Sequence, residues 1–168
     1  MLTYEFRGNG GGDGLERDTI TIRRAAQRDI PSLLRLYGMF ASAYDDDPDG
    51  ILPGEADALF DRIDADGNQA LLVAEQENRV IGTLVLVVVP NLAHRGQPWA
   101  IVENVAVDER ARSRGVGTLM MEEAVRRARG ARCYKLVLSA HHTRTESHRL
   151  YRYLGLQQTH LGFEMLLI

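Results

Sequence analysis

Apolar residues follow two patterns along this chain. Some segments are short, nearly continuous apolar runs rich in β-branched residues, which predict strands, and others have apolar positions every three or four residues, which predict amphipathic helices. A Glu77-Asn78 pair between two long apolar runs predicts a tight hairpin turn. Strands are expected at 19–25, 69–76, 79–89, 99–107, 134–140, 157–161 and 163–168, and helices are expected to begin near 29, 55, 116 and 143.

The resulting order, β-α-α-β-β-β-α-β-α-β-β, predicts an α/β domain built on a mixed sheet. The length of 168 residues suits one domain with a substantial core. Residues 1–18 contain the stretch GNGGGDG, which is costly to order and offers little to bury, so we expect a flexible tail there and one folded domain over 19–168. The last helix is expected to open with a capping box of Thr143 and Glu146 and to end near Gly155.

Composition excludes several classes of protein. The formal net charge of −3 argues against a nucleic-acid-binding protein, which is usually basic, and the single cysteine, Cys133, excludes an internal disulfide or a cysteine-rich zinc site. No apolar run approaches the ~20 residues that a membrane span needs, and the N-terminus lacks the apolar core of a signal peptide. We therefore expect a soluble, cytoplasmic protein without nucleic-acid or membrane partners.

The net charge hides two opposed charged segments. Residues 43–66 hold nine acidic residues and one arginine, a formal charge of −8, and residues 109–132 hold seven arginines and three glutamates, a formal charge of +4. Segments of this kind attract ligands of opposite charge, but they are also typical of the solvated faces of helices. Charge alone leaves both interpretations open.

The segment 102–129 combines a strand, a turn rich in arginine and glycine, and a helix. A helix N-terminus carries unpaired N–H groups and partial positive charge, so it favours an anion. Gly115 and Gly117 would let the backbone approach phosphate oxygens, and Arg112 and Arg114 would add forked donors. The P-loop of nucleotide-binding proteins needs a lysine after its glycines and the dinucleotide fingerprint needs a third glycine, and this segment has neither.

This segment, VENVAVDERARSRGVGTLMMEEAV, resembles motif A of the GNAT superfamily of N-acetyltransferases, whose core Arg/Gln-x-x-Gly-x-Gly/Ala is matched by 112–117. Downstream, SHRLYRYLGL resembles the second signature of that superfamily, with Leu156 where phenylalanine is usual, and CYKLVLSA resembles its fifth strand. The resemblance covers the chain from about residue 19. It implies a mostly antiparallel sheet flanked by helices, in which the fourth and fifth strands, at 99–107 and 134–140, splay apart.

The superfamily transfers an acetyl group from acetyl-CoA directly to an amine. By this resemblance the backbone N–H groups of 112–117 hold the pyrophosphate, and the fourth strand offers main-chain groups to the pantetheine amides between the splayed strands. An N–H group near Val105 would polarise the thioester carbonyl. The expected acetyl-CoA-binding residues are Val105, Ala106, Val107, Arg112, Ser113, Arg114, Gly115, Val116 and Gly117.

Two side chains are candidates for proton transfer. Glu103 would act as the general base, because its strand leads to the thioester and related small-amine acetyltransferases often carry a glutamate there; a purely structural carboxylate is the alternative. Tyr151 occupies the tyrosine position of the superfamily and would act as the general acid for the leaving thiolate; a packed helix aromatic is the alternative. Strict strand alternation would put Glu103, Val105 and Val107 on one face and Asn104 and Ala106 on the other.

The acceptor is less well specified. In this superfamily the first two helices border the acceptor cleft, so Asp45, Asp46 and Asp47 would draw in a cationic amine. The pair His141-His142 suggests a metal, but no carboxylate or cysteine completes a ligand set, so no metal is expected.

The expected function is transfer of an acetyl group from acetyl-CoA to the primary amine of a small molecule, by direct attack in a ternary complex. A protein or peptide acceptor and a non-catalytic CoA-binding sensor remain alternatives. The apolar ending FEMLLI would pair at a sheet edge or lie under a partner, so a homodimer stays open.

Overall fold

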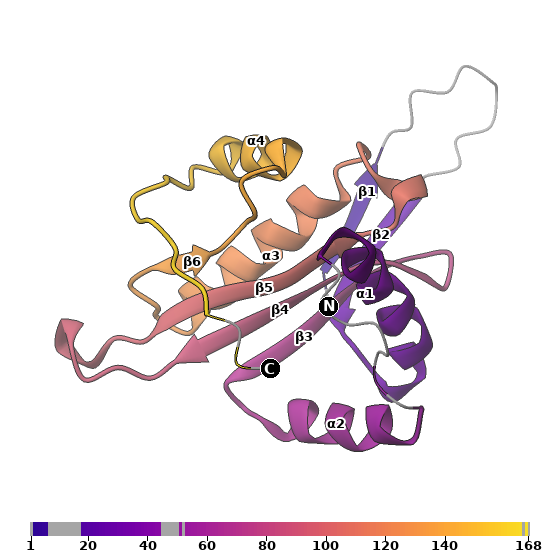
Figure 1. The fold of residues 1–168 in the computed structure, drawn as a ribbon, viewed down its shortest axis with the longest axis horizontal. Coiled ribbons are helices and arrows are strands. Elements are labelled where there is room, and N and C mark those ends of the chain that lie inside the picture. The colour runs from indigo at the N-terminus through magenta and orange to yellow at the C-terminus, as the bar shows by residue number, and fades with distance from the viewer. Residues whose placement is uncertain (1, 7–17, 45–50, 52, 166, 168) are drawn as a thin grey trace.

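The computed structural model describes residues 2–6, 18–44, 51, 53–165 and 167. Six strands form one sheet in the order β1-β2-β3-β4-β5-β6 (Figure 1). All neighbours pair antiparallel except β5 and β6, which pair parallel. This confirms the predicted mixed, mostly antiparallel sheet. The strands are β1 (Leu2–Phe6), β2 (Asp18–Arg24), β3 (Gln69–Gln76), β4 (Arg79–Val89), β5 (Trp99–Val107) and β6 (Leu136–Leu138).

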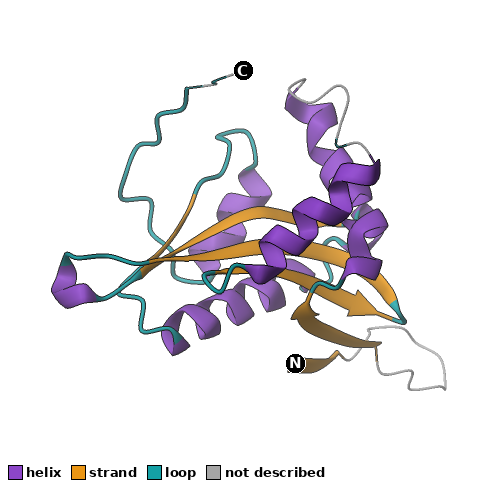
Figure 2. Cartoon of the chain, turned by 90° about the horizontal axis from the view of Figure 1, so that it is seen from below, coloured by secondary structure: helices purple, strands orange, loops and turns teal. Residues whose placement is uncertain are grey.

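Helices cover both faces of the sheet (Figure 2). Side chains of α1 (Ile30–Tyr44) and α2 (Pro53–Ala65) share one core cluster, and side chains of α3 (Val116–Gly130) and α4 (Thr145–Tyr153) pack in the other. Among the helices of the described residues, none combines the length and apolar character that crossing a bilayer demands. Short 3₁₀ turns lie at Gln27–Asp29, His94–Gly96 and Glu109–Ala111.

The close fit of α3 on the sheet depends on Gly82 of β4. A Cβ at this position would lie 2.9 Å from the Met120 sulfur and 3.2 Å from the Ala106 carbonyl oxygen. Since neither neighbour has room to withdraw in a close-packed core, a larger residue would push α3 away. The position of α3 matters for function, because its N-terminus forms the predicted phosphate site.

The sheet opens on one side of β5. Its first residues pair with β6 through Ala100, Ile101 and Val102, but from Glu103 onward β5 has β4 on one side and, in the described part of the chain, no strand on the other. The predicted splay between the fourth and fifth predicted strands is therefore present, as β5 and β6. It leaves main-chain groups at the end of β5 without a neighbouring strand.

Both ends of the chain differ from the prediction. A flexible tail was expected over 1–18, but Leu2–Phe6 forms β1 and pairs with β2, and Tyr4 packs against the core on the α3 face. Its sequence, LTYEF, alternates apolar and polar residues as a half-buried strand does. The prediction of a flexible tail gave more weight to the glycine-rich stretch that follows. Residues 7–17, which contain those glycines, lie outside the described residues.

Strands were also expected at 157–161 and 163–168, but 157–165 and 167 form no strand. The last helix begins at Thr145, two residues later than predicted. The expected capping box does not form, because the Thr143 hydroxyl hydrogen-bonds the Nδ1 atom of His141 at 2.8 Å. The predicted helix end is confirmed: Gly155 has φ +85° and its N–H donates to the Arg152 carbonyl.

A buried carboxylate of α3 is paired with two arginines of the same helix. Glu123 is fully buried and accepts hydrogen bonds of 2.7–2.8 Å from the guanidinium groups of Arg126 and Arg127. Burial raises the pKa of Glu123, but the hydrogen bonds and charges of the two arginines outweigh it and hold the pKa below its usual value. Such a group contributes stability that is fully present above its unfolded-state pKa of ~4.3 and is lost as pH falls through the lower folded-state pKa.

We therefore expect Glu123→Gln to lower the free energy of unfolding by about 2 kcal/mol at pH 7. Below about pH 4 the difference in unfolding free energy between wild type and variant should shrink, because the wild-type carboxyl loses its charge there. Urea unfolding at pH 7 and pH 3.5 measures both values. Glu122→Gln, on the exposed neighbour, should have little effect, and an undiminished loss at pH 3.5 would contradict the ionic account.

Candidate active site

The N-terminus of α3 is the predicted anion site. Gly115, the residue before the helix, has φ +79°, and Ser113 has φ +60°. The first helical bond runs from the Leu119 N–H to the Gly115 carbonyl. Among the described residues, the N–H groups of Val116, Gly117 and Thr118 donate to no backbone carbonyl. These are the unpaired donors that make a helix N-terminus favourable for phosphate.

The two glycines of this loop have different roles. Of the pair, only Gly115 adopts positive φ, which glycine allows without strain. At Gly117 an added Cβ would lie 3.2 Å from Cδ2 of Leu150 on α4. The second glycine thus lets α4 approach the first turn of α3, a packing role that the motif itself did not reveal.

Both loop arginines are exposed to solvent. The Arg112 Nε–H donates a long hydrogen bond of 3.4 Å to the Val107 carbonyl, and a guanidinium nitrogen lies 3.8 Å from a Glu109 carboxylate oxygen. Arg114 is exposed as well. Weak surface contacts of this kind cost little to exchange for a phosphate.

An arginine of α1 fixes the start of this loop. Arg35 donates to the Asp108 carboxylate at 2.7 Å and to the Val80 carbonyl at 3.1 Å. The second carboxylate oxygen of Asp108 accepts the Arg110 N–H, and the Asp108 N–H donates to the Ile81 carbonyl. The backbone hydrogen bond from Arg110 lowers the pKa of Asp108, burial opposes this, and Arg35 lowers the pKa further, so the carboxylate stays charged. Asp108 thereby links α1, β4 and the loop.

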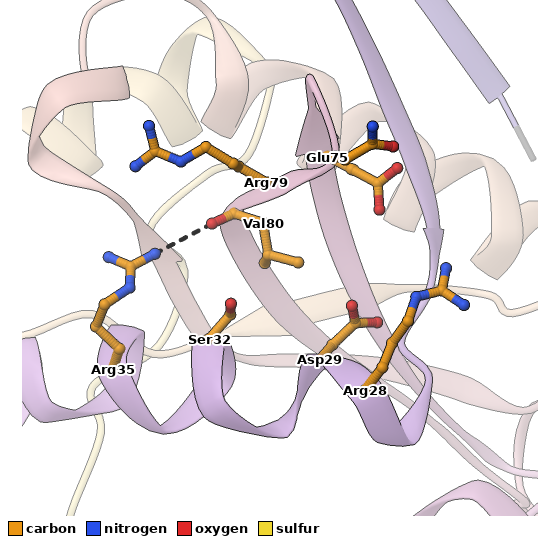
Figure 3. Close-up of a pocket in the computed structure, with 8 residues that line it drawn as sticks. Arg28, Asp29, Ser32, Arg35, Glu75, Arg79 and Val80 are labelled. Carbon is orange, nitrogen blue, oxygen red and sulfur yellow. Dashed lines mark hydrogen bonds between the residues drawn. The ribbon is translucent and has the colours of Figure 1, made fainter.

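Arg35 also lines a cavity of about 440 Å³ beside the β3–β4 turn (Figure 3). Ser32 and Arg79 line the same cavity. Asp29 and Glu75 line it too, and both of their carboxylates accept hydrogen bonds from Arg23. None of the residues predicted for catalysis or acetyl-CoA binding lines this cavity. Its connection to the loop runs through Arg35 and Asp108.

Replacing Arg35 with methionine should raise the KM for acetyl-CoA about 5-fold with little change in kcat. The expected reason is that Asp108 loses a partner and the loop before α3 loses its fixed geometry, a cost of about 1 kcal/mol for a half-exposed pair. Initial-rate kinetics with varied acetyl-CoA measures this. Arg28→Met, in the wall of the same cavity, is the control and should leave KM unchanged; an equal rise in both variants would contradict the role of Asp108.

A bulge in β5 changes the predicted arrangement of its side chains. Val85 pairs with Glu103, but Thr83 pairs with Ala106, so β5 has one extra residue here, and Asn104 takes φ +53°. Alternation therefore reverses at Asn104. Val105 and Val107 pack on the α3 face, whereas Glu103 shares the opposite face with its partner Val85 and with Ala106. The prediction that Glu103, Val105 and Val107 share a face is wrong for this reason.

Glu103 lies at the open side of β5, because the pairing of β5 with β6 ends at Val102. Its side chain is exposed, yet partial burial raises the pKa of its carboxyl. A carboxylate with a raised pKa binds a proton more readily, which suits a general base.

Tyr151 on α4 is half-buried and packs against the core on the α3 face. Burial raises its pKa, the positive charge of Arg144 lowers it, and the negative charge of Glu103 raises it, with a net increase. Tyr151 thus lies within electrostatic range of both Glu103 and Arg144. Arg144 was not predicted as a site residue, because its approach to Tyr151 depends on how the loop before α4 folds.

The remaining candidates contribute less. His141 contacts Thr143, and the His148 ring nitrogen lies 3.1 Å from the His141 carbonyl. Within the described ranges, no group of three or more histidine, cysteine, aspartate or glutamate side chains has the geometry of a metal site. Burial raises the pKa of Cys133, which makes its thiol less nucleophilic. Asp45, Asp46 and Asp47 lie outside the described residues.

Comparison with known families identifies this arrangement. The family model described as the acetyltransferase (GNAT) family matches residues 34–156. The chain belongs to the GNAT family. It is accordingly an acetyl-CoA-dependent N-acetyltransferase, and the resemblance inferred from the sequence is confirmed.

Solved structures share the GNAT fold. A protein of Agrobacterium tumefaciens str. C58 assigned as an acetyltransferase is 32% identical with a TM-score of 0.78, over 87% of this chain and 99% of that one. Glucosamine-6-phosphate N-acetyltransferase from Arabidopsis thaliana is 19% identical with a TM-score of 0.79, over 90% and 100%. An aminoglycoside acetyltransferase from an uncultured soil metagenomic sample is 19% identical with a TM-score of 0.73, over 89% and 97%. The last two show likeness of fold alone.

Proposed function

We propose that this GNAT protein acetylates the primary amine of a small, cationic molecule, with Glu103 as the base and Tyr151 as the proton donor. The observation that carries the proposal is the position of Glu103: a carboxyl of raised pKa at the open side of β5, within electrostatic range of Tyr151. The acidic segment 43–66 supports a cationic acceptor. The amine-bearing substrates named for two structural neighbours support a small one.

Acetyl-CoA fits the donor groups of this chain in two places. The unpaired N–H groups at the start of α3 and the exposed Arg112 and Arg114 suit its pyrophosphate. The side of β5 that lacks a neighbouring strand, at 105–107, suits the amides of its pantetheine arm. When bound, acetyl-CoA supplies the activated acetyl thioester.

Glu103 removes the main obstacle to the reaction. An alkylamine with a pKa of ~10.4 is protonated at pH 7, and its deprotonation costs roughly 4–5 kcal/mol without assistance. Glu103 accepts this proton, directly or through a water molecule, and the free amine attacks the thioester carbonyl carbon. A C–N bond forms and the C–S bond breaks, so the electron pair of that bond leaves on sulfur, and the nitrogen gives up its second proton to solvent.

Tyr151 serves the leaving sulfur. Because its pKa is raised, the phenol keeps its proton at neutral pH and is a poorer acid than free tyrosine. Full proton transfer to a thiolate is therefore unfavourable, since a free thiol has a pKa of ~8.5 against ~10 for tyrosine. We infer that Tyr151 donates a hydrogen bond that strengthens as charge develops on sulfur, and that the thiolate takes its final proton from solvent.

Thiol release from acetyl-CoA, measured with a panel of amines, tests the proposal. Small diamines, polyamines and aminoglycosides should support turnover, and Tyr151→Phe should lower kcat about 30-fold. Tyr153→Phe is the matched control, because that ring is 81% exposed and lies two residues further along the same helix. Equal rates for Tyr151→Phe and wild type would remove Tyr151 from the reaction.

The same panel separates the alternatives. Turnover on basic peptides but not on small amines would favour a protein or peptide acceptor, and saturable acetyl-CoA binding without thiol release on any acceptor would favour a sensor. Replacing Asp45, Asp46 and Asp47 with asparagine tests whether these residues attract the acceptor. Turnover of a dicationic amine that is insensitive both to that change and to salt would contradict attraction by the acidic segment.

A further inference from the structure

The cavity beside the β3–β4 turn holds hydrogen-bond donors that the fold does not use. Within the described ranges, neither the guanidinium group of Arg79 nor the hydroxyl group of Ser32 makes a hydrogen bond or ion pair, and both residues line the cavity. Arg35 lines it as well and donates one hydrogen bond to the Asp108 carboxylate and one to the Val80 carbonyl. Since a guanidinium group has five N–H donors, Arg35 keeps others for a ligand.

The charge around the cavity favours an anion. The two carboxylates of its lining, Asp29 and Glu75, are both paired with Arg23. Asp108, the third carboxylate of this region, is paired with an arginine of the lining. When Arg23 and Asp108 are counted together with the lining residues, four arginines face three carboxylates, so an excess of positive charge remains.

We propose that this cavity binds a small phosphate monoester and that its occupancy lowers the affinity for acetyl-CoA. A phosphate monoester carries a charge of roughly −1.5 to −2 at pH 7 and has three strong acceptor oxygens. The forked donors of Arg35 and Arg79, which lie on the same side of the cavity in Figure 3, suit these oxygens, and the Ser32 hydroxyl adds a further donor. The volume of about 440 Å³ leaves room for an organic part beside Asn78.

The cavity lies too far from Glu103 to hold the acetyl acceptor. It is lined by Val80, near the start of β4, whereas Glu103 pairs with Val85 further along that strand. At ~3.4 Å per residue, Val80 and Val85 are roughly 17 Å apart. A small ligand in the cavity therefore acts on the reaction only through the protein.

Arg35 connects the cavity to the loop before α3. An anion beside Arg35 attracts its guanidinium group and repels the Asp108 carboxylate, so it weakens the contact that fixes the start of the loop. The affinity for acetyl-CoA should therefore fall about 5-fold, as it should when Arg35 is replaced. Because coupling between two binding sites is reciprocal, acetyl-CoA should weaken binding of the anion by the same factor. This coupling rests on the proposed role of the loop in acetyl-CoA binding, but not on the identity of the acceptor.

Titration calorimetry with glycerol 3-phosphate at constant ionic strength tests the proposal. In the presence of saturating acetyl-CoA, one equivalent of glycerol 3-phosphate should still bind, with a Kd of about 1 mM or lower. As its concentration rises, the apparent Kd for acetyl-CoA should increase to a plateau about 5-fold higher. Two ligands that compete for one site give no plateau, so an increase without limit would place the anion at the N-terminus of α3 and overturn the proposal.

Two variants locate the site. Arg79→Met should weaken the binding of glycerol 3-phosphate about 10-fold and Ser32→Ala about 3-fold, because each removes one donor to the phosphate. Arg129→Met is the matched control, since it also removes one positive charge but from an exposed position at the end of α3, and it should change neither Kd. Equal weakening in Arg79→Met and Arg129→Met would reduce the effect to general charge attraction. Thermal unfolding of each variant establishes that it is folded.

Two further results would overturn the inference. Absence of saturable binding of glycerol 3-phosphate would remove the site, and binding without any change in the Kd for acetyl-CoA would remove the coupling. Glycerol 3-phosphate is also titrated into the protein alone, and no titration contains an amine. A failure of thiol release, or of acetyl-CoA binding itself, is therefore distinguishable from a failure of this site.

Discussion

Replacing Glu103 with glutamine is expected to lower kcat/KM about 100-fold for an alkylamine acceptor, the range in which loss of a general base falls. Glutamine keeps the size and polarity of the side chain but cannot accept a proton. Glu103 makes no hydrogen bond or ion pair to another described side chain, so the substitution leaves no buried partner unsatisfied and should not change the stability. Steady-state kinetics together with thermal unfolding separates the catalytic effect from a structural one.

The pH dependence gives the sharper result. A base works when it is deprotonated, so wild-type kcat/KM should fall as pH drops through the pKa of Glu103, which burial raises above the usual value. The variant should lack this step and keep only the ionisation of the amine itself. Glu77→Gln, in the β3–β4 turn, should retain the wild-type profile. An unchanged acidic limb in Glu103→Gln would assign the step to another group.

The turn before α3 and the start of that helix were predictable from the sequence because their physics is local. A glycine at the first helix boundary, arginines before it and apolar residues at helical spacing after it specify a turn and a helix N-terminus wherever they occur. The observed cap at Gly115, and the burial of Val116, Leu119 and Met120, follow that pattern. The hairpin turn at Glu77 and Asn78, both with positive φ, is a second local feature that was predicted correctly.

The faces of Val105 and Val107 relative to Glu103 were not predictable, because they depend on one backbone angle at Asn104. Asparagine tolerates the left-handed conformation better than most residues, and Asn104 adopts it, which inserts one residue into β5 and reverses the faces that follow. Strict alternation of side chains along a strand does not predict an inserted residue. The single polar amide within an apolar strand was the available signal.

The missed contacts of α1 and α4 have a common cause: they join residues far apart in the chain. Arg35 meets Asp108 across 73 positions, and Leu150 meets Gly117 only because α4 crosses the start of α3. At the C-terminus the opposite occurred. The apolar residues of 157–161 and 163–168 predicted two strands, but the described residues of this segment pair with no strand of the sheet. The apolar pattern of a segment indicates which secondary structure it is able to form, and tertiary contacts decide whether that structure forms.

Gly115→Val should weaken acetyl-CoA binding about 30-fold. At φ +79° a β-branched residue costs ~2 kcal/mol or more, and the loop lowers that strain by rotating to negative φ. Rotation turns the N–H groups at the start of α3 away from the position of a phosphate, so relief of the backbone strain lowers the affinity for acetyl-CoA. Titration calorimetry with acetyl-CoA measures the affinity, and thermal unfolding measures the stability.

Gly96→Val separates strain from position. Gly96 has φ +75°, close to that of Gly115, and an added Cβ there meets no atom within 4 Å, so the backbone penalty is matched and the surroundings add nothing. It lies in the β4–β5 loop, away from the start of α3. The control should therefore lose comparable stability while binding acetyl-CoA normally. If only Gly115→Val loses affinity for acetyl-CoA, the N-terminus of α3 is the anion site. If both variants bind acetyl-CoA equally well, the left-handed cap at Gly115 serves only the fold of the loop, and the N–H groups of α3 do not hold the pyrophosphate.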